Sequence, residues 1–415
     1  MTKAVEAQVT GIGHAGDGLV CQNTRTVYVP WTVPGDTIRF VADQDCRGTL
    51  EAVVVPSRHR IAPVCQHFAD CGGCVAQHFD AATYLNWRRE QIVGALRRRG
   101  FEAPPVAEPV MIDAGTRRRA TLAWRRTKGC VLLGFRARGT HRIVDMSMCP
   151  ALHPSIVAML DGFRKLASRL EVAGRLDVTV CDNGLDVTLE QRHEPDLEVR
   201  QAIGRFASDT GVARVSWRAG QGGAPDLIIQ HQPPIVTMAG VALKFPAATF
   251  LQPSVDGEIA LQNAVTDMVG DAKRIADLFC GCGTLSLAMA RRGAVDAFDS
   301  DRYAIDALRA AAGVGGKLHA LGAASRDLFR RPLALDELAA YDAVVFDPPR
   351  AGAAAQATAL AQSDVPTVVA VSCHPATFAR DARLLVDGGY ALRRVVSIDQ
   401  FVWSQHLEVV ALFER

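Results

Sequence analysis

Short apolar segments alternate with Ala- and Leu-rich helical stretches from about residue 246 to residue 415. The segments with strand character read RIADLF, AVDAFDS, YDAVVFD and TVVAVSC. This alternation is typical of a parallel β-sheet covered by helices, because each crossover between parallel strands needs a long connection. We therefore predict a catalytic α/β domain over residues 246–415.

The rest of the chain predicts two further domains, which agrees with the two or three expected for 415 residues. Residues 1–56 alternate apolar and polar positions between glycine-rich turns, which is the pattern of a small β-barrel. Residues 57–245 contain predicted helices over 81–100 and 154–170 and otherwise read mostly as strands, which predicts a mixed sheet. The fold class is therefore multidomain α/β.

The composition is that of a globular protein without a membrane span. Hydrophobic residues make up 49% of the chain and 46 Lys and Arg nearly balance 44 Asp and Glu, which excludes a disordered or acidic-tail protein. We expect a cytoplasmic protein, because we find neither a signal segment nor a long uncharged apolar run. Residues 88–142 hold 14 Lys and Arg against 4 acids, which favours either a polyanion-binding surface or a solvated arginine surface.

Three of the eleven cysteines form a compact motif. Cys65, Cys71 and Cys74 are separated by five and two residues, and two glycines lie between the last pair. Cys149, which precedes a proline, is the best candidate for a fourth thiol. Four thiolates suit an iron–sulfur cluster or zinc, but the first spacing is longer than zinc ribbons prefer. The motif therefore favours an iron–sulfur cluster, with zinc as the alternative.

A glycine-containing loop predicts a cofactor site. The strand RIADLF runs directly into CGCGT, residues 280–284, and then into a helical stretch. Glycines at such a turn let a ligand approach the backbone closely. Asp299 ends the next strand and is placed to bond ribose hydroxyls, and Asp327 is placed to face an adenine. Because the loop lacks the third glycine of a dinucleotide site, it favours S-adenosylmethionine.

Three more polar residues lie at strand ends on the same predicted edge, namely Asp347, Cys373 and Glu408. A cysteine thiolate that adds to carbon 6 of uracil makes carbon 5 nucleophilic enough to accept a methyl group. Glu408 is suited to remove the carbon 5 proton afterwards, while Asp347 would hold the uracil edge or the cofactor amine. The alternative for Cys373 is a buried thiol with no chemical role.

Together, these motifs resemble the RNA 5-methyluridine methyltransferase family, in particular its iron–sulfur branch that acts on 23S ribosomal RNA. The resemblance implies a TRAM-like RNA-binding barrel of the oligonucleotide-binding type over residues 1–56. It implies a central α+β domain with a 4Fe-4S cluster and a basic RNA-facing surface over 57–245. For residues 246–415 it implies a Rossmann-like class I methyltransferase domain.

The resemblance also implies roles for single residues. Cys373 is the implied nucleophile and Glu408 the implied base. The residues implied to contact S-adenosylmethionine, or to lie beside the methyl group and the target base, are Gln252, Phe279, Gly281, Thr284, Asp299, Asp327 and Asp347. The implied cluster ligands are Cys65, Cys71, Cys74 and Cys149. The chain departs from the family at His374 and Ser254, where the family has asparagine.

The predicted activity is methylation of carbon 5 of one uridine in RNA by S-adenosylmethionine, through a covalent adduct with Cys373. We favour 23S rRNA as the partner and expect a monomeric enzyme without a membrane partner. The same chemistry on tRNA and a non-catalytic RNA-binding assembly factor remain alternatives. A radical enzyme that uses both the cluster and S-adenosylmethionine is disfavoured, because the C-x3-C-x2-C spacing of that group is absent.

Overall fold

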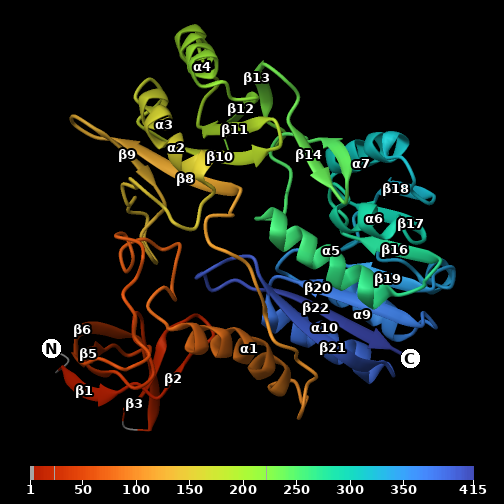
Figure 1. Cartoon of the computed structure of the whole chain (residues 1–415), viewed down its shortest axis with the longest axis horizontal. Coiled ribbons are helices and arrows are strands. Elements are labelled where there is room, and N and C mark those ends of the chain that lie inside the picture. Colours follow the sequence, from red (N-terminus) through yellow and green to blue (C-terminus); the bar gives the residue numbers. More distant parts are fainter. Residues whose placement is uncertain (1–3, 23, 221) are drawn as a thin grey trace.

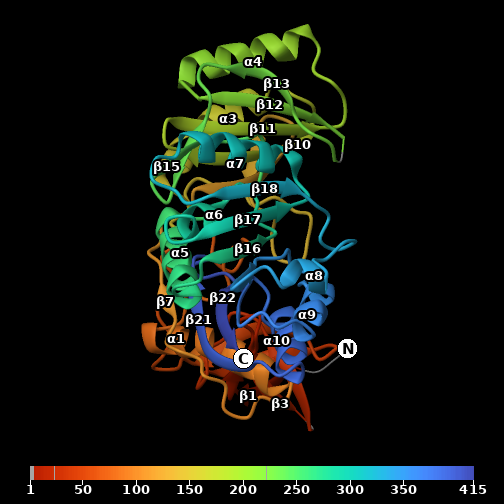
Figure 2. The ribbon, with the colours of Figure 1, turned by 90° about the vertical axis from the view of Figure 1, so that its right-hand side faces the viewer.

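The computed structural model describes residues 4–22, 24–220 and 222–415 (Figure 1). Three β-sheet regions follow one another along the molecule. In Figure 2 a six-stranded sheet lies at the top, an eight-stranded sheet in the middle and a β-rich N-terminal region at the bottom. No helix in the described part of the chain is long and apolar enough to cross a membrane.

The N-terminal region contains two three-stranded sheets, with strand orders β1-β5-β6 and β2-β3-β4. Their strands are β1 Val5–Gln8, β2 Gly11–Ile12, β3 Gly18–Gln22, β4 Arg25–Val29, β5 Thr37–Ala42 and β6 Gly48–Val55. Val20 and Val27 from one sheet and Ile38 and Phe40 from the other share one apolar core. This agrees with the β-rich pattern predicted for residues 1–56.

The central sheet has the strand order β13-β12-β11-β10-β8-β9. It is mixed, as predicted, because β11 and β12 run parallel and the other neighbours antiparallel. Its strands are β8 Arg119–Arg126, β9 Val131–Gly134, β10 Ala173–Cys181, β11 Gly184–Gln191, β12 Arg214–Ala219 and β13 Asp226–Gln230. Helices α3 and α4 pack against it and are described next.

The helices of the central sheet differ from the prediction. The single helix predicted over 154–170 is wrong, because the chain breaks at Met159 into α2 (Pro154–Ala158) and α3 (Leu160–Ala167). Helix α4 (Leu197–Thr210) was not predicted at all. It begins at the N-cap Asp196 and buries Ile203 and Phe206, so its signal is a narrow apolar stripe in a polar stretch.

The eight-stranded sheet has the order β18-β17-β16-β19-β20-β22-β21-β7. The first five of these strands run parallel, as predicted, and β22 runs antiparallel to both of its neighbours. The strands are β7 Val110–Met111, β16 Arg274–Leu278, β17 Ala294–Asp299, β18 Leu321–Ser325, β19 Ala343–Phe346, β20 Thr367–Ser372, β21 Ala391–Asp399 and β22 Glu408–Glu414. Because β22 is antiparallel, it begins at the edge where β20 ends.

Helices cover both faces of this sheet (Figure 2). They are α5 Val255–Val269, α6 Thr284–Met289, α7 Arg302–Val314, α8 Leu335–Leu338, α9 Ala354–Ala361 and α10 Pro375–Asp387. Residues of α5 and α6 share a core with one face, and residues of α8, α9 and α10 share a core with the other.

Besides the edge strand β7, two further segments from the range predicted for the central domain pack with the eight-stranded sheet. Helix α1 (Ala81–Arg97) begins at the N-cap Asp80 and buries Ile92 and Leu96 in the core under α10. The hairpin of β14 (Ile235–Met238) and β15 (Val241–Lys244) packs against α7 in the same way. Both segments therefore help to position the edge where the candidate active site lies.

Candidate active site

The loop that follows β16 has an unusual backbone. Phe279, Gly281 and Gly283 all have a positive φ, of 64°, 54° and 91°. A Cβ atom at Gly283 would lie 2.3 Å from Cδ1 of Leu308, so only glycine fits between the loop and α7. At Gly281 a Cβ would meet no atom within 4 Å, which leaves the backbone there open to a ligand.

Asp299 ties this loop to the end of β17. Its carboxylate accepts hydrogen bonds from the backbone N–H of Gly281, at 2.9 Å, and of Asp301, at 2.8 Å. The structure thus brings Asp299 to the glycine loop, as the sequence spacing predicted. Thr284 begins α6, and its hydroxyl lies 3.8 Å from the sulfur of Met238.

The ring of Phe279 lies on the β18 side of the loop. Its centroid is 5.3 Å from that of Phe329, whose side chain is exposed. Asp327 lies two residues before Phe329 and accepts hydrogen bonds from the backbone N–H groups of Phe329 and Arg330, at 3.1 and 3.2 Å. Two aromatic rings and a carboxylate therefore gather at the end of β18.

The carboxyl groups of Asp277, Asp299 and Asp347 lie within electrostatic reach of one another beside the loop. Burial raises the pKa of Asp277 and of Asp347 to about 7 each, and the negative charge of Asp299 adds to both shifts. Oδ2 of Asp277 accepts a hydrogen bond from Ser286 at 2.5 Å, whereas Oδ1 has no partner among the described residues. This excess of negative charge would be relieved by a bound cation.

Cys373 lies at the end of β20, half-buried and within electrostatic reach of two carboxyl groups. Burial raises the pKa of its thiol to about 12, and the charges of Glu408 and Asp347 add to the effect, while Arg350 opposes it. His374, the departure next to Cys373, is the N-cap of α10, and its Nδ1 accepts from the N–H of Thr377 at 3.4 Å. Histidine can thus fill the capping role of asparagine here.

Glu408 is the first residue of β22 and is only 3% exposed. Its Oε2 accepts a hydrogen bond from Nε2 of Gln400 at 3.0 Å, and the same nitrogen donates to Oε1 of Gln252 at 2.8 Å. Burial and the charge of Asp347 raise the pKa of Glu408 well above its usual range. Gln252 and Glu408 were predicted as site residues, but Gln400, which links them, was not.

Ser254, the other departure from the family pattern, has a local structural role. Its hydroxyl is buried and accepts from the N–H of Gly257 at 3.0 Å, which caps α5. This cap fixes the start of the helix directly after Gln252. Serine and asparagine are both good N-caps, so the substitution preserves this contact.

A groove of about 400 Å³ with two arginine–phenylalanine stacks lies beside these glutamines. Arg119 lies 4.9 Å from the ring of Phe250, and Arg117 lies 5.7 Å from the ring of Phe401. Burial lowers the pKa of Arg119 to about 10, which leaves it charged at neutral pH. Such stacks of arginine on aromatic rings suit the bases and phosphates of single-stranded RNA.

The basic cluster over residues 88–142 is less available to a polyanion than its count suggested. Arg88 is fully buried and pairs with Asp399 at 2.6 Å, and Arg118 is buried and pairs with Glu258 at 2.6 Å. The prediction that the arginines of residues 88–142 form a polyanion-binding or solvated surface is therefore wrong for Arg88 and Arg118. A count of charged residues in the sequence cannot show which guanidinium groups turn inward.

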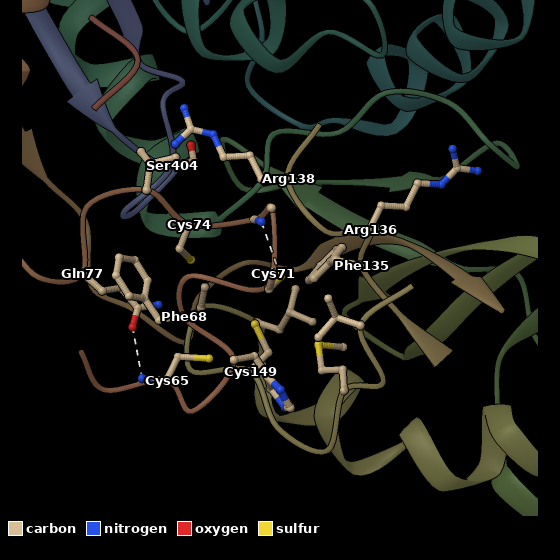
Figure 3. Close-up of a pocket in the computed structure, with 18 of the residues that line it drawn as sticks. Cys65, Phe68, Cys71, Cys74, Gln77, Phe135, Arg136, Arg138, Cys149 and Ser404 are labelled. Carbon is tan, nitrogen blue, oxygen red and sulfur yellow. Dashed lines mark hydrogen bonds between the residues drawn. The ribbon is translucent and has the colours of Figure 1, made fainter. Parts of the chain in front are cut away.

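Cys65, Cys71, Cys74 and Cys149 line one cavity of about 590 Å³ (Figure 3). The cavity lies between the cysteine segment and the loop after β21, because Gln400 and His406 also line it. Burial raises the pKa of all three thiols at positions 71, 74 and 149, in the case of Cys74 to about 12. In the part of the chain that the structure describes, no three His, Cys, Asp or Glu side chains are grouped closely enough to hold a single metal ion.

Comparisons with known proteins agree on one family. Residues 320–415 match the family described as tRNA (uracil-5-)-methyltransferase. An uncharacterized RNA methyltransferase of Brucella melitensis is 40% identical over 421 residues, which cover 100% of this chain and 99% of that protein. The 23S rRNA (uracil(1939)-C(5))-methyltransferase RlmD of Halomonas elongata is 32% identical and covers 99% of this chain and 89% of its own length.

A solved structure has the same fold. The tRNA (uracil-54, C5)-methyltransferase of Pyrococcus abyssi, in complex with S-adenosyl-L-homocysteine, matches with a TM-score of 0.75 at 22% identity, over 99% of this chain and 100% of that chain. At this identity the likeness concerns the mixed α/β fold alone. Because the match to the Halomonas enzyme spans nearly the whole chain at 32% identity, the protein belongs to the RNA uracil-5-methyltransferase family.

Proposed function

We propose that the protein methylates carbon 5 of one uridine in 23S rRNA, with S-adenosylmethionine as methyl donor. The observation that carries this proposal is the meeting of Cys373, Asp347 and Glu408 at one edge of the sheet, next to the glycine loop. A non-catalytic assembly factor would not need a thiol and a buried carboxyl in this arrangement, so we prefer the enzymatic reading.

The residues around the glycine loop fit S-adenosylmethionine. The donor carries an ammonium and a sulfonium cation, and burial together with neighbouring carboxylate charge raises the pKa of Asp277 and of Asp347 in the free protein. Asp299 is assigned to the ribose hydroxyls, with Phe279 and Asp327 on the adenine side. Gly281 and Thr284 belong to the loop, and Gln252 would lie beside the methyl group. When bound, S-adenosylmethionine supplies an electrophilic methyl group to carbon 5.

Cys373 opens the proposed reaction. Its thiolate adds to carbon 6 of the uracil ring, and the electrons of the carbon 5–carbon 6 double bond move toward the carbonyl oxygen at carbon 4. Carbon 5 thereby becomes nucleophilic enough to take the methyl group. The pKa of about 12 means that the thiol is protonated in the free protein at neutral pH. A cationic ligand near Asp347 and Glu408 would lower that pKa.

Glu408 completes the reaction by accepting the proton from carbon 5. The electrons of that carbon–hydrogen bond restore the double bond, and the bond between carbon 6 and sulfur breaks with its electrons returning to Cys373. The hydrogen bond from Gln400 favours the carboxylate form that this step requires. Burial opposes ionisation, which makes the carboxylate a stronger base once it has formed.

The four cysteines fit a 4Fe-4S cluster by their chemistry and their placement. Four thiolates are the usual ligand set of such a cluster, and all four thiols line one cavity. Cys65, Cys71, Cys74 and Cys149 would hold the cluster, and its role would be structural, because no step of the proposed reaction transfers electrons.

Anaerobically purified protein is expected to be brown and to contain about four irons per chain. Cys74→Ala should lose the iron, because it removes a ligand, whereas Cys130→Ala should keep it, because Cys130 is exposed and does not line the cavity. Metal analysis and visible absorption of the three proteins test this. Stoichiometric zinc without iron in the wild-type protein would contradict the assignment and support the zinc alternative.

We propose that three parts of the chain have separate roles. Residues 1–56 would act as a TRAM-like RNA-binding barrel, residues 57–245 as the cluster-bearing RNA-facing part, and residues 246–415 as the Rossmann-like methyltransferase domain. The target uridine must leave its stack, because neighbouring bases shield carbon 6 in a helix. The groove with Arg117, Arg119 and Phe250 is suited to hold the RNA beside the extruded base.

The substrate is tested by mapping 5-methyluridine in ribosomal and transfer RNA from cells with and without the gene. The likeness to the Halomonas enzyme favours loss of one 5-methyluridine in 23S rRNA. The match of residues 320–415 to the tRNA family keeps tRNA as the second candidate. Loss of a methyl group from tRNA alone would move the proposal to that substrate, and unchanged methylation in both RNAs would refute it.

A further inference from the structure

The segment that joins β21 to β22 carries two groups of the proposed site. The segment begins with Gln400, and Glu408 is the first residue after its end. Trp403, in its middle, has a positive φ of 60°, a conformation that large side chains adopt only when their surroundings enforce it. We call residues 400–407 the base loop. Its position sets where the carboxyl group of Glu408 meets the proton on carbon 5.

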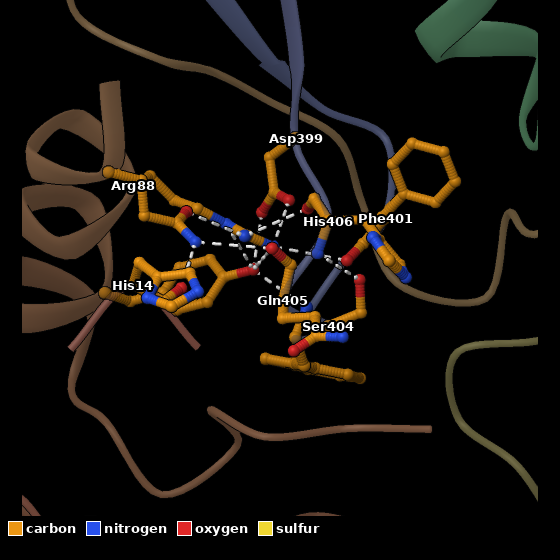
Figure 4. Close-up of polar contacts among 10 residues, drawn as sticks. His14, Arg88, Asp399, Phe401, Ser404, Gln405 and His406 are labelled. Atoms are coloured by element: carbon orange, nitrogen blue, oxygen red, sulfur yellow. Dashed lines mark hydrogen bonds and ion pairs between the residues drawn. The ribbon is translucent and has the colours of Figure 1, made fainter. Parts of the chain in front are cut away.

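Arg88 of helix α1 forms hydrogen bonds near both ends of the base loop (Figure 4). Its guanidinium pairs with Asp399 at 2.6 Å and donates to the backbone oxygen of Phe401 at 3.2 Å. It also donates to the backbone oxygen of His406 at 3.0 Å. One side chain therefore bridges the residue before Gln400 and a residue near Glu408.

Tyr84 of the same helix holds the middle of the base loop. Its hydroxyl donates to Asp399 at 2.6 Å, and it accepts from the backbone N–H of Trp403 at 2.8 Å and from Arg88. The backbone oxygen of Trp403 in turn accepts from the N–H of Val75, at 2.7 Å. Tyr84 thus links the strained residue to the buried ion pair.

The ion pair of Arg88 and Asp399 is costly to bury, since both side chains are completely inaccessible to solvent. A buried pair of this kind often adds little stability compared with apolar residues, but it fixes geometry, because each lost contact leaves a charge unsatisfied. Its contacts here converge on the base loop. This indicates a role in placing the loop rather than in stabilising the fold alone.

We propose that Tyr84 and Arg88 are positioning residues for the removal of the carbon 5 proton by Glu408. This inference rests on the proposed function. Helix α1 holds the base loop so that Glu408 and Gln400 keep their place while the uracil is bonded to Cys373. When the loop loosens, proton removal slows, and the covalent intermediate persists. Donor binding is unaffected, because none of the hydrogen bonds that Tyr84 and Arg88 form with other described residues reaches the glycine loop.

The test compares two conservative hydroxyl deletions, Tyr84→Phe and Tyr390→Phe. Both tyrosines are buried, but the hydroxyl of Tyr390 donates to the backbone oxygen of Val365, away from the base loop. Each full-length protein is given S-adenosylmethionine and total RNA from cells that lack the gene, which contains the unmodified target whichever RNA carries it. Samples are quenched in detergent at intervals, and the covalent protein–RNA adduct and 5-methyluridine are measured.

In Tyr84→Phe the adduct is expected to release its RNA about tenfold more slowly and to accumulate. The reason is that the buried hydroxyl, with its hydrogen bonds to the base loop, is lost. Its dissociation constant for S-adenosylmethionine should stay within about twofold of the wild-type value, and Tyr390→Phe should resemble the wild type throughout. Resolution of the adduct at the wild-type rate in Tyr84→Phe would overturn the inference. Equal slowing in both variants would overturn it too, because it would indicate a general loss of stability.

A second pair of variants keeps the charge. Arg88→Lys cannot span Asp399, Phe401 and His406 together, so it should also accumulate adduct. Arg214→Lys is the control, because Arg214 forms a buried, bidentate salt bridge with Asp186 in the central sheet. Adduct accumulation in Arg214→Lys as well would contradict a specific role of Arg88. A wild-type protein that forms neither adduct nor 5-methyluridine would refute the proposed function itself, and the inference with it.

Discussion

Replacement of Cys373 with alanine is expected to lower the rate of 5-methyluridine formation by roughly 10⁴-fold or more, because the reaction loses its nucleophile. Without addition at carbon 6, carbon 5 of uracil is too weakly nucleophilic to accept a methyl group. The variant should still bind S-adenosylmethionine, since the glycine loop and Asp299 are unchanged. Methyl incorporation into RNA and calorimetric titration of S-adenosylmethionine measure the two effects.

Cys181→Ala is the matched control for this experiment. Cys181 is also buried, and burial raises the pKa of its thiol to about 12 as well, but it lies at the end of β10 and is not part of the proposed site. This variant should methylate RNA at nearly the wild-type rate. Full turnover by Cys373→Ala, or equal loss in both variants, would contradict the role given to Cys373.

Replacement of Glu408 with glutamine should trap the protein on its RNA. Methyl transfer can still occur, but the amide cannot accept the proton from carbon 5, so the bond between sulfur and carbon 6 cannot break. We expect a covalent complex that survives denaturing electrophoresis, and a fall in turnover of roughly 10³-fold, within the range for loss of a general base. The covalent complex and the turnover are both measured with S-adenosylmethionine that carries a labelled methyl group.

The control variant for this trap is Glu414→Gln, which makes the same change at the other end of the same strand. Glu414 pairs with Arg393 near the surface, so its loss should leave turnover and adduct level unchanged. If Glu408→Gln released methylated RNA as fast as the wild type, another group would have to remove the proton.

Much of the eight-stranded sheet could be predicted from the sequence, because the signals are local. Three of the four apolar runs end at Asp299, Asp347 or Cys373 and the fourth leads into the glycine loop, and the structure places all four ends at one edge. A last strand that begins at Glu408 was also predicted, but its antiparallel direction is known only from the structure. Its start at that edge brings Glu408 within electrostatic reach of Cys373. The placement of Asp299 beside the glycine loop was predicted from spacing, whereas its hydrogen bond with the N–H of Gly281 was not.

The contacts that sequence reasoning missed are long-range. Gln400 lies in a loop without any motif, and its partner Gln252 is 148 residues away. Arg88 reads as one of many arginines on a helix, and its partner Asp399 is 311 residues away. Only the folded chain shows that this charge turns inward. Helix α4 was missed for a different reason, because few apolar residues mark its buried face.

The most direct test of the account is the mass of the cysteine-containing peptides after Glu408→Gln has reacted with RNA and S-adenosylmethionine and the RNA has been digested. If Cys373 is the nucleophile, its peptide carries one 5-methyluridine nucleotide and the peptides with the other cysteines carry none. An unmodified Cys373 in protein whose RNA has been methylated, or a nucleotide attached to a different residue, would contradict it.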